Sequence, residues 1–193
     1  MKVEFGLSNL YYFDVTESNG VYTFGVPKQI QGAKSMKLSF DAKETKEYAD
    51  NILWYYLSKV TSASADVSVE VLPDEFKTKY MSYRKSDTGS LQYDLSKIPG
   101  NFGMMFQTDT DVDPIKYIIW NNHINGESDQ EHNTNEDELS LFNPSFSTTA
   151  SALNTSDGKI LFGYYDKTDS NYATLFTKAP TLPTFTNESK TTG

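Results

Sequence analysis

The feature that most constrains the fold of this chain is a recurring pattern of short runs in which apolar and polar residues alternate, bounded by turn-forming residues. Residues 10–15 (LYYFDV) and 21–26 (VYTFGV) are two such runs, and the stretch 16–20 (TESNG) separates them. Its Asn-Gly pair is a strong signal for a tight turn between antiparallel strands. The pattern therefore predicts a β-hairpin near the start of the sequence.

Further runs of the same kind predict strands along the rest of the chain. In the run 67–71 (VSVEV), strand side chains alternate between two faces, so we expect Val67, Val69 and Val71 in the core and Glu70 on the opposite face. The other predicted strands are 36–40 (MKLSF), 102–107 (FGMMFQ), 115–120 (IKYIIW), 159–165 (KILFGYY) and 172–178 (YATLFTK), with a turn at 166–171.

Length and aromatic content agree with a β fold. A chain of 193 residues is long enough for one domain with a substantial core. Its 13 Tyr and 12 Phe residues pack well on pleated, half-buried surfaces. We therefore expect a mainly β protein, an antiparallel β-sandwich or barrel with one packed α-helix. Residues 1–178 form this domain, and residues 179–193, which contain Pro180 and Pro183, form an extended C-terminal arm.

The one helix is predicted at residues 73–83 (PDEFKTKYMSY). Pro73 suits the first helical position, and the acidic residues after it suit the positive N-terminal end of a helix. Phe76, Tyr80 and Tyr83 recur at helical spacing and form one apolar stripe. We expect this stripe to pack on the sheet.

Residues 41–58 (DAKETKEYADNILWYYLS) are polar in their first half and densely aromatic in their second half. We interpret them as a long polar loop that leads into a strand from about Ile52. Trp54, Tyr55 and Tyr56 are consecutive, so they point to both faces of any strand. A second sheet, a bound ligand such as a sugar, or a neighbouring subunit would have to cover them.

Charge and cysteine content exclude several classes of function. The chain has no cysteine, so it contains neither disulfides nor thiolate metal sites. Its net charge of −9 argues against binding to nucleic acid by neutralisation of phosphates. Residues 126–138 (GESDQEHNTNEDE) hold six of the acids and no Lys or Arg, so we expect a solvated loop there. Neither a signal peptide nor a membrane span is expected.

Two groups of residues resemble metal ligands. Asp109, Asp111 and Asp113 open like a calcium-binding loop, but Pro114 stands where that loop needs Gly and Trp120 where it needs Glu. We therefore interpret them as a surface turn. The two histidines, His123 and His132, lie near the acids Glu127, Asp129 and Glu131, but their spacing matches no helical ligand pattern. We expect no metal and no cofactor at either place.

No catalytic motif is present. The sequence lacks a nucleophile elbow, a phosphate-binding loop and a dinucleotide fingerprint, and neither histidine lies in a recognisable triad context. We assign no catalytic residue and expect that the protein is not an enzyme. A hydrolase that uses paired carboxylates is a weak alternative, because the acids gather in loops rather than across a cleft.

The order of six segments resembles one family. The segments are FGLSNLYYFDVT, YTFGVPKQIQGAKSMKLSF, KEYADNILWYY, VSVEVLPDEF, FGMMFQTDTD and IKYIIWNN, the last followed by an acidic stretch. In this order the chain resembles, from about Phe5 to about Phe176, the phi13-type major tail proteins of long-tailed phages that infect Gram-positive bacteria.

The resemblance implies a tail-tube fold and a structural role in the virion tail. Subunits of this family form hexameric rings that stack around a tape-measure protein, and DNA later passes through the lumen. The tube would end on tail terminator and distal tail proteins and would be assembled in the host cytoplasm. The family has no catalytic residues, so none is carried over. The chain lacks the appended immunoglobulin-like domain of longer relatives.

Two expectations follow from the resemblance and from its main alternative. For a tube, we expect the polar segment 41–51 and the aromatic run after it to make contacts between subunits. Glu70 would face either the lumen, where its charge repels DNA, or solvent on the outer surface. The alternative is a carbohydrate-binding β-sandwich module of a phage receptor-binding apparatus. Such a module would use exposed Trp or Tyr side chains and remain a small oligomer.

Overall fold

The computed structural model describes residues 3–127 and 143–185, and within them the protein is mainly β, with one short α-helix. The prediction of a mainly β fold with one packed helix is confirmed. The elements are β1 (Glu4–Ser18), β2 (Val21–Phe24), β3 (Lys28–Gln29), β4 (Ala33–Ala49), β5 (Ile52–Val69), α1 (Asp74–Tyr80), β6 (Tyr83–Lys85), β7 (Leu91–Tyr93), β8 (Phe102–Thr110), β9 (Ile115–Glu127), β10 (Ser145–Ser151), β11 (Leu153–Thr155), β12 (Gly158–Ile160), β13 (Phe162–Tyr165) and the 3₁₀ turn η1 (Tyr172–Thr174).

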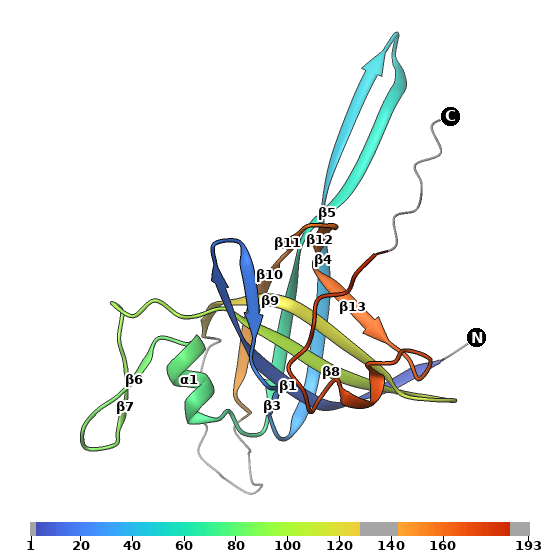
Figure 1. Ribbon diagram of the computed structural model, residues 1–193. Coiled ribbons are helices and arrows are strands. Elements are labelled where there is room, and N and C mark those ends of the chain that lie inside the picture. Colours follow the sequence, from blue (N-terminus) through green and yellow to red (C-terminus); the bar gives the residue numbers. More distant parts are fainter. Residues whose placement is uncertain (1–2, 128–142, 186–193) are drawn as a thin grey trace, which may run out of the picture.

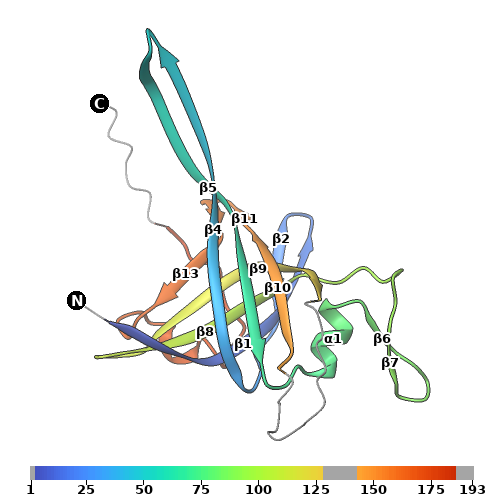
Figure 2. The same cartoon turned by 180° about the vertical axis from the view of Figure 1, so that it is seen from behind.

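Nine strands form one antiparallel sheet in the order β2-β1-β8-β9-β10-β5-β4, with β3 added to β1 and β13 added to β9. Figures 1 and 2 show that β1, β8 and β9 cross over β10, β5 and β4, so the curved sheet encloses its own core. The predicted first hairpin is correct, because β1 pairs with β2 and both residues of the Asn19-Gly20 turn have positive φ angles.

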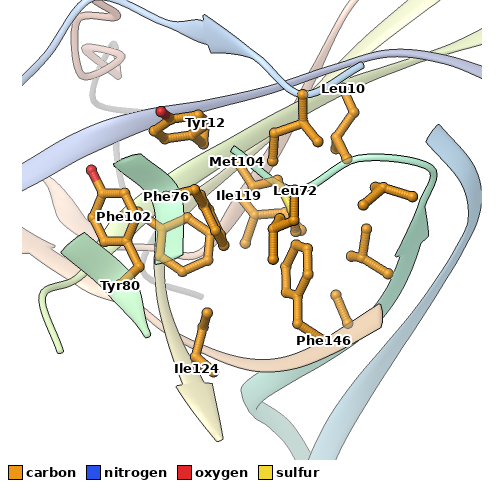
Figure 3. Packing of buried hydrophobic residues seen from close by; sticks show 14 of the residues in the cluster. Leu10, Tyr12, Leu72, Phe76, Tyr80, Phe102, Met104, Ile119, Ile124 and Phe146 are labelled. Atoms are coloured by element: carbon orange, nitrogen blue, oxygen red, sulfur yellow. The ribbon is translucent and has the colours of Figure 1, made fainter. Parts of the chain in front are cut away.

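The main core lies on the concave face of this curved sheet. Figure 3 shows aromatic and aliphatic side chains of β1, β8, β9 and β10 packed against Leu72 and the α1 residues Phe76 and Tyr80. On β5, the core residues are Ala63, Ala65, Val67 and Val69. The helix therefore closes one end of the core, as its apolar stripe predicts.

Two details of the predicted stripe and strand are wrong. Tyr83 belongs to β6 rather than to the helix, because α1 ends at Tyr80. Val71 is 61 % exposed, because β5 ends at Val69 and the alternation ends with it. Glu70 follows that end, donates its backbone N–H to the Gly32 carbonyl at 2.8 Å, and pairs with Lys34 at 3.6 Å. Strand alternation therefore does not determine the direction in which the Glu70 side chain points.

A second apolar cluster covers the convex face of β1, β8 and β9, and this explains why β8 is apolar at successive positions. Met104 faces the main core and Met105 the second cluster, and both are fully buried. Phe13 of β1 lies over Gly103 of β8, its partner across the strands, so closely that a Cβ on Gly103 would lie 1.8 Å from the ring.

The C-terminal segment covers part of this convex face without a strand. The predicted strand at 172–178 is wrong: the segment contains η1 and a run of turns, because Tyr172 and Phe176 together enclose the Lys116 ammonium. Lys116 Nζ lies 4.3 Å and 4.5 Å from the two ring centroids and donates to the Tyr172 carbonyl at 2.8 Å. Burial lowers the pKa of Lys116. Farther along, Pro180 is buried and Leu182 packs on the cluster.

A polar network attaches the helix to the sheet. Asp14 of β1 accepts hydrogen bonds from the Tyr80 hydroxyl and from Lys79 Nζ, the latter at 3.1 Å. Burial raises the pKa of Asp14, but the bonds from Tyr80 and Lys79 outweigh it and the pKa is lowered overall. Burial and the bond to Asp14 raise the pKa of Tyr80. Glu75 of α1 pairs with Lys79 and with Lys28 of β3.

Candidate interaction surface

The most prominent surface feature is a two-stranded arm that extends from the sheet (Figures 1 and 2). It comprises residues 42–60, the distal parts of β4 and β5 and the turn between them. The proximal part of β5 pairs with β10 from Ser62 to Ser68, whereas the arm pairs only within itself. Nine residues of β5 lie in the arm, and at the usual rise per residue they extend about 30 Å.

The polar loop predicted at residues 41–51 is therefore wrong, because β4 continues as a regular strand to Ala49. The turn consists of Asp50 and Asn51, which both have positive φ angles, as a two-residue hairpin turn requires. The segment 43–47 (KETKE) has no apolar residue on either face, so it shows no alternation although it is a strand. The Asp-Asn pair between two runs was the one signal of a hairpin.

Every residue of the arm is exposed, although it carries large apolar side chains. Trp54 is 79 % exposed, Tyr48 67 % and Ile52 66 %. The other large apolar side chains exposed on the arm are Leu53, Tyr55, Tyr56, Leu57 and Val60. So many exposed apolar side chains on one element are typical of an interaction site, and a two-stranded hairpin alone is marginally stable in water. The arm thus has the composition of a surface that a partner covers.

The two faces of the arm differ. Tyr56 is opposite Lys46 across the strands, and its hydroxyl donates a hydrogen bond to Glu44 Oε1 at 3.0 Å. Lys46 Nζ lies 5.5 Å from the centroid of the Tyr56 ring and forms an ion pair with Glu44 at 2.8 Å. These contacts lower the pKa of Glu44 and raise that of Lys46. On the other face, Tyr55 and Leu57 are followed by Lys59, which lies directly opposite Lys43.

Both edges of the arm lack a neighbouring strand in the described part of the chain. Such edges present unpaired backbone N–H and C=O groups that another strand can bind. One irregularity interrupts them: Tyr48 pairs with Leu53 and Glu47 with Tyr55, so Trp54 is the extra residue of a β-bulge. The bulge explains why Trp54 is more exposed than its neighbours Tyr55 and Tyr56.

The residues that resemble metal ligands in the sequence lie, where they are described, in a surface turn and on an exposed strand position. Thr110 Oγ1 accepts bonds from the backbone N–H groups of Val112 and Asp113, and Asp113 pairs with Lys167, so the D-x-D-x-D segment is a turn. His123 is exposed on β9, with Nδ1 3.3 Å from Asn101 Oδ1. His132, Asp129 and Glu131 lie outside the described residues. Among the residues that are described, no three His, Cys, Asp or Glu side chains gather as a metal site.

Sequence reasoning also missed the Lys116 cage, in which Tyr172 and Phe176 enclose the Lys116 ammonium, and the network around Asp14. Both join residues more than 50 positions apart, such as Lys116 with Tyr172 and Asp14 with Tyr80, so no local pattern reveals them. Within residues 3–127 and 143–185, no helix is long and apolar enough to cross a membrane. Comparison with models of known protein families and with curated proteins finds no match for this chain.

Proposed function

We propose that this protein is a structural subunit that self-assembles into the tube of a phage tail, of the kind the phi13-type major tail proteins form. The observation that carries the proposal is the arm, a solvated two-stranded ribbon whose exposed apolar side chains and open edges are not covered by any other element of the described chain. Contacts with other copies would bury these side chains and pair these edges. The resemblance in segment order supports the same conclusion.

In this proposal the protein is a building block rather than an enzyme, and it needs no cofactor. Hexameric rings stack around a tape-measure protein, and the finished tube ends on tail terminator and distal tail proteins. The tube belongs to the virion tail and is assembled in the host cytoplasm. DNA passes through the lumen without specific binding, which the net charge of −9 per chain favours because like charges repel.

One face of the sheet is suited to the wall of such a channel. On the face of β4, β5 and β10 opposite the core, most side chains are small hydroxyl groups, and they form rows across the three strands. Its charged residues, Lys37, Asp66 and Asp41, bring a net charge of only −1. A wet surface without large apolar groups holds a polyanion weakly. The rows are Ser35–Ser68–Ser145, Lys37–Asp66–Ser147, Ser39–Ser64–Thr149 and Asp41–Ser62–Ser151.

The test of the proposal is assembly with and without the arm. Replacing residues 42–61 with Asn-Gly joins Asp41 to Ser62, which are paired across β4 and β5, through a two-residue turn. Deleting only part of one strand would leave the other unpaired. We expect the full-length protein to form rings or tubes at high concentration in electron micrographs. The armless variant should remain a monomer in light scattering and still unfold cooperatively on heating, which shows that the body is folded.

Carbohydrate binding is the second candidate, because the exposed Trp54, Tyr55 and Tyr56 side chains also suit stacking against sugar rings. The same experiment separates the two functions. A carbohydrate-binding module stays a small defined oligomer at every concentration, and it binds immobilised cell-wall polysaccharide through Trp54. Full-length protein that remains a monomer at high concentration would contradict the tube and favour this alternative.

A further inference from the structure

Two lysines on the arm lie directly opposite each other, an arrangement that costs stability in an isolated hairpin. Lys43 of β4 is the cross-strand partner of Lys59 of β5, so both side chains extend from the same face. Like charges in this position repel each other. Both residues are exposed, and neither forms an ion pair within the described part of the chain. By contrast, Lys46 on the other face is paired with Glu44.

This face of the arm is thus basic near its base and mixed beyond, where Leu57 and Tyr55 lie opposite Thr45 and Glu47. Leu57 is paired with Thr45 next to the lysine pair, and Tyr55 is paired with Glu47 one step farther toward the tip. Both apolar side chains are about half exposed. A partner that supplies carboxylates beside the lysines would turn the repulsion between Lys43 and Lys59 into attraction for both.

The chain itself contains a segment whose charge is opposite to that of the lysine pair. Residues 126–138 hold six acids and no Lys or Arg. The segment connects β9, which ends at Glu127, with β10, which begins at Ser145. Ser145 pairs with Ser68 at the end of β5 that is remote from the arm, and Ser151 pairs with Ser62 at the base of the arm. The acidic connection therefore leaves the sheet at the end opposite to the arm.

Because the arm and the acidic connection lie at opposite ends of the sheet, a contact between two copies is favoured over one within a single copy. Lys59 and Ser68 are nine residues apart on one strand, or about 30 Å. Eighteen residue steps separate Glu127 from Ser145, so a connection anchored at both ends reaches about 30 Å only when both legs are fully stretched. A second copy placed end to end presents its acidic connection to the arm with no such constraint.

We propose that the Lys43–Lys59 pair docks against the acidic segment 126–138 of a second copy of this chain, so that subunits join head to tail. This inference rests on the proposed function and specifies its contact. A contact between two unlike surfaces is heterologous, so it cannot form a symmetric closed dimer and can repeat from copy to copy. Because the two surfaces lie at opposite ends of the molecule, we assign this contact to the stacking of one ring on the next.

The first test reverses the charge of the arm without changing its internal repulsion. In the variant Lys43→Glu/Lys59→Glu, two like charges still face each other, so the folded monomer keeps its stability while attraction for the acidic segment is lost. We expect the critical concentration for assembly to rise at least about tenfold at moderate salt. The control Lys85→Glu/Lys159→Glu makes the same change in net charge at exposed positions outside the arm, and should assemble as wild type does.

The second test restores the attraction. Adding Glu136→Lys, Asp137→Lys and Glu138→Lys to the reversed arm should return the critical concentration to within about threefold of the wild-type value. The same three substitutions with the wild-type arm should impair assembly. A reversed arm that assembles as well as its control, or a combined variant that is not restored, would overturn the proposed docking.

Cross-linking identifies the partner independently. Because the chain has no cysteine, Lys59→Cys and Asp137→Cys introduce the only thiols, each in a separate protein. Mixed tubes treated with a short bis-maleimide should give covalent dimers, whereas a Lys85→Cys and Asp137→Cys mixture should not. A protein that carries both Lys59→Cys and Asp137→Cys but cross-links only within monomers would contradict docking between copies. Wild-type protein that never assembles would contradict the proposed function itself.

Discussion

The long hairpin of β4 and β5 has two halves that share the same strands and the same antiparallel pairing but differ in what covers them. In the proximal half, Ala63, Ala65, Val67 and Val69 face the core and alternate with exposed or half-exposed serine and aspartate. In the arm, every residue is exposed. Apart from local bulges, antiparallel pairing continues through both halves, so burial is not required for the strand geometry itself.

The comparison shows where stability resides. The proximal half is held by a third strand, β10, and by the apolar core, which supplies most of the free energy of folding. The arm has only its own cross-strand pairs, each worth a fraction of a kcal/mol. In this hairpin, one half is stabilised by the fold, and the proposed function assigns the other half to contacts with a partner. Four predictions test the division.

The largest effect is expected from introducing a charge into each half. Val67→Asp places a carboxylate at a position that is 1 % exposed, and it should cost about 4 kcal/mol or more of the free energy of unfolding. Leu57→Asp changes a position in the arm that is 48 % exposed, and it should change that free energy by less than about 0.5 kcal/mol. Urea denaturation of the two monomeric variants measures both values. Equal losses would show that the arm is part of the cooperative core.

A smaller effect is expected from adding methyl groups. Gly103→Ala should cost about 1–3 kcal/mol, because its Cβ would overlap the Phe13 ring. Ala42→Val in the arm adds more volume at an exposed position opposite Val60 and outside the core, so its unfolding midpoint should stay at the wild-type value. Thermal unfolding checks both variants. The double variant Phe13→Leu/Gly103→Ala should recover part of the loss, unless the strain arises elsewhere.

A pH-dependent effect should distinguish the two polar networks. The pKa of Asp14 is lowered in the folded state, so its network stabilises the protein above the unfolded-state pKa of about 3.9, and this contribution is lost as the pH falls through the folded-state pKa. Tyr80→Phe should cost about 1 kcal/mol at pH 7 and less at pH 3. Tyr56→Phe, which disrupts the exposed network of the arm, should leave unfolding unchanged at both pH values. Denaturation series at the two pH values give the comparison.

The smallest effect concerns the turn at the tip. Asp50 and Asn51 adopt positive φ angles that Asn-Gly adopts with less strain. The variant Asp50→Asn/Asn51→Gly should stabilise the arm by a few tenths of a kcal/mol without shifting the global unfolding midpoint. Amide hydrogen exchange of residues 42–60 reports this local change. A shift of the global midpoint would argue that the arm and the body unfold together.

Sequence patterns predicted the elements that have at least one buried face. The first hairpin, the strands beginning at Phe102 and Ile115 and the helix at Asp74 were all found, because burial on one or both faces leaves a readable pattern. The run 159–165 was found as one strand but is divided at Leu161 into β12 and β13. The pattern failed where neither face is buried, as in the polar strand of the arm.

The aromatic half of the arm was recognised as unusual, and within the described residues no second sheet covers it. Cover by a ligand or by a neighbouring subunit stays a prediction. Its geometry was beyond sequence reasoning, since the register of Lys43 with Lys59 depends on the bulges on either side of them. The Lys116 cage and the Asp14 network depend on contacts between distant segments. The acidic segment was predicted as a solvated loop, and residues 128–142 lie outside the described residues.

The way in which the arm joins the body also determines how the molecule bears a mechanical load. A pull on the tip runs along the covalent backbone of β5 into the sheet, where seven residue pairs join β5 to β10. The hydrogen bonds between antiparallel strands are perpendicular to the strands, so this pull loads them in shear and all together. Peeling would break them one at a time. A filament linked through such arms would therefore stretch little along the strand direction and fail abruptly.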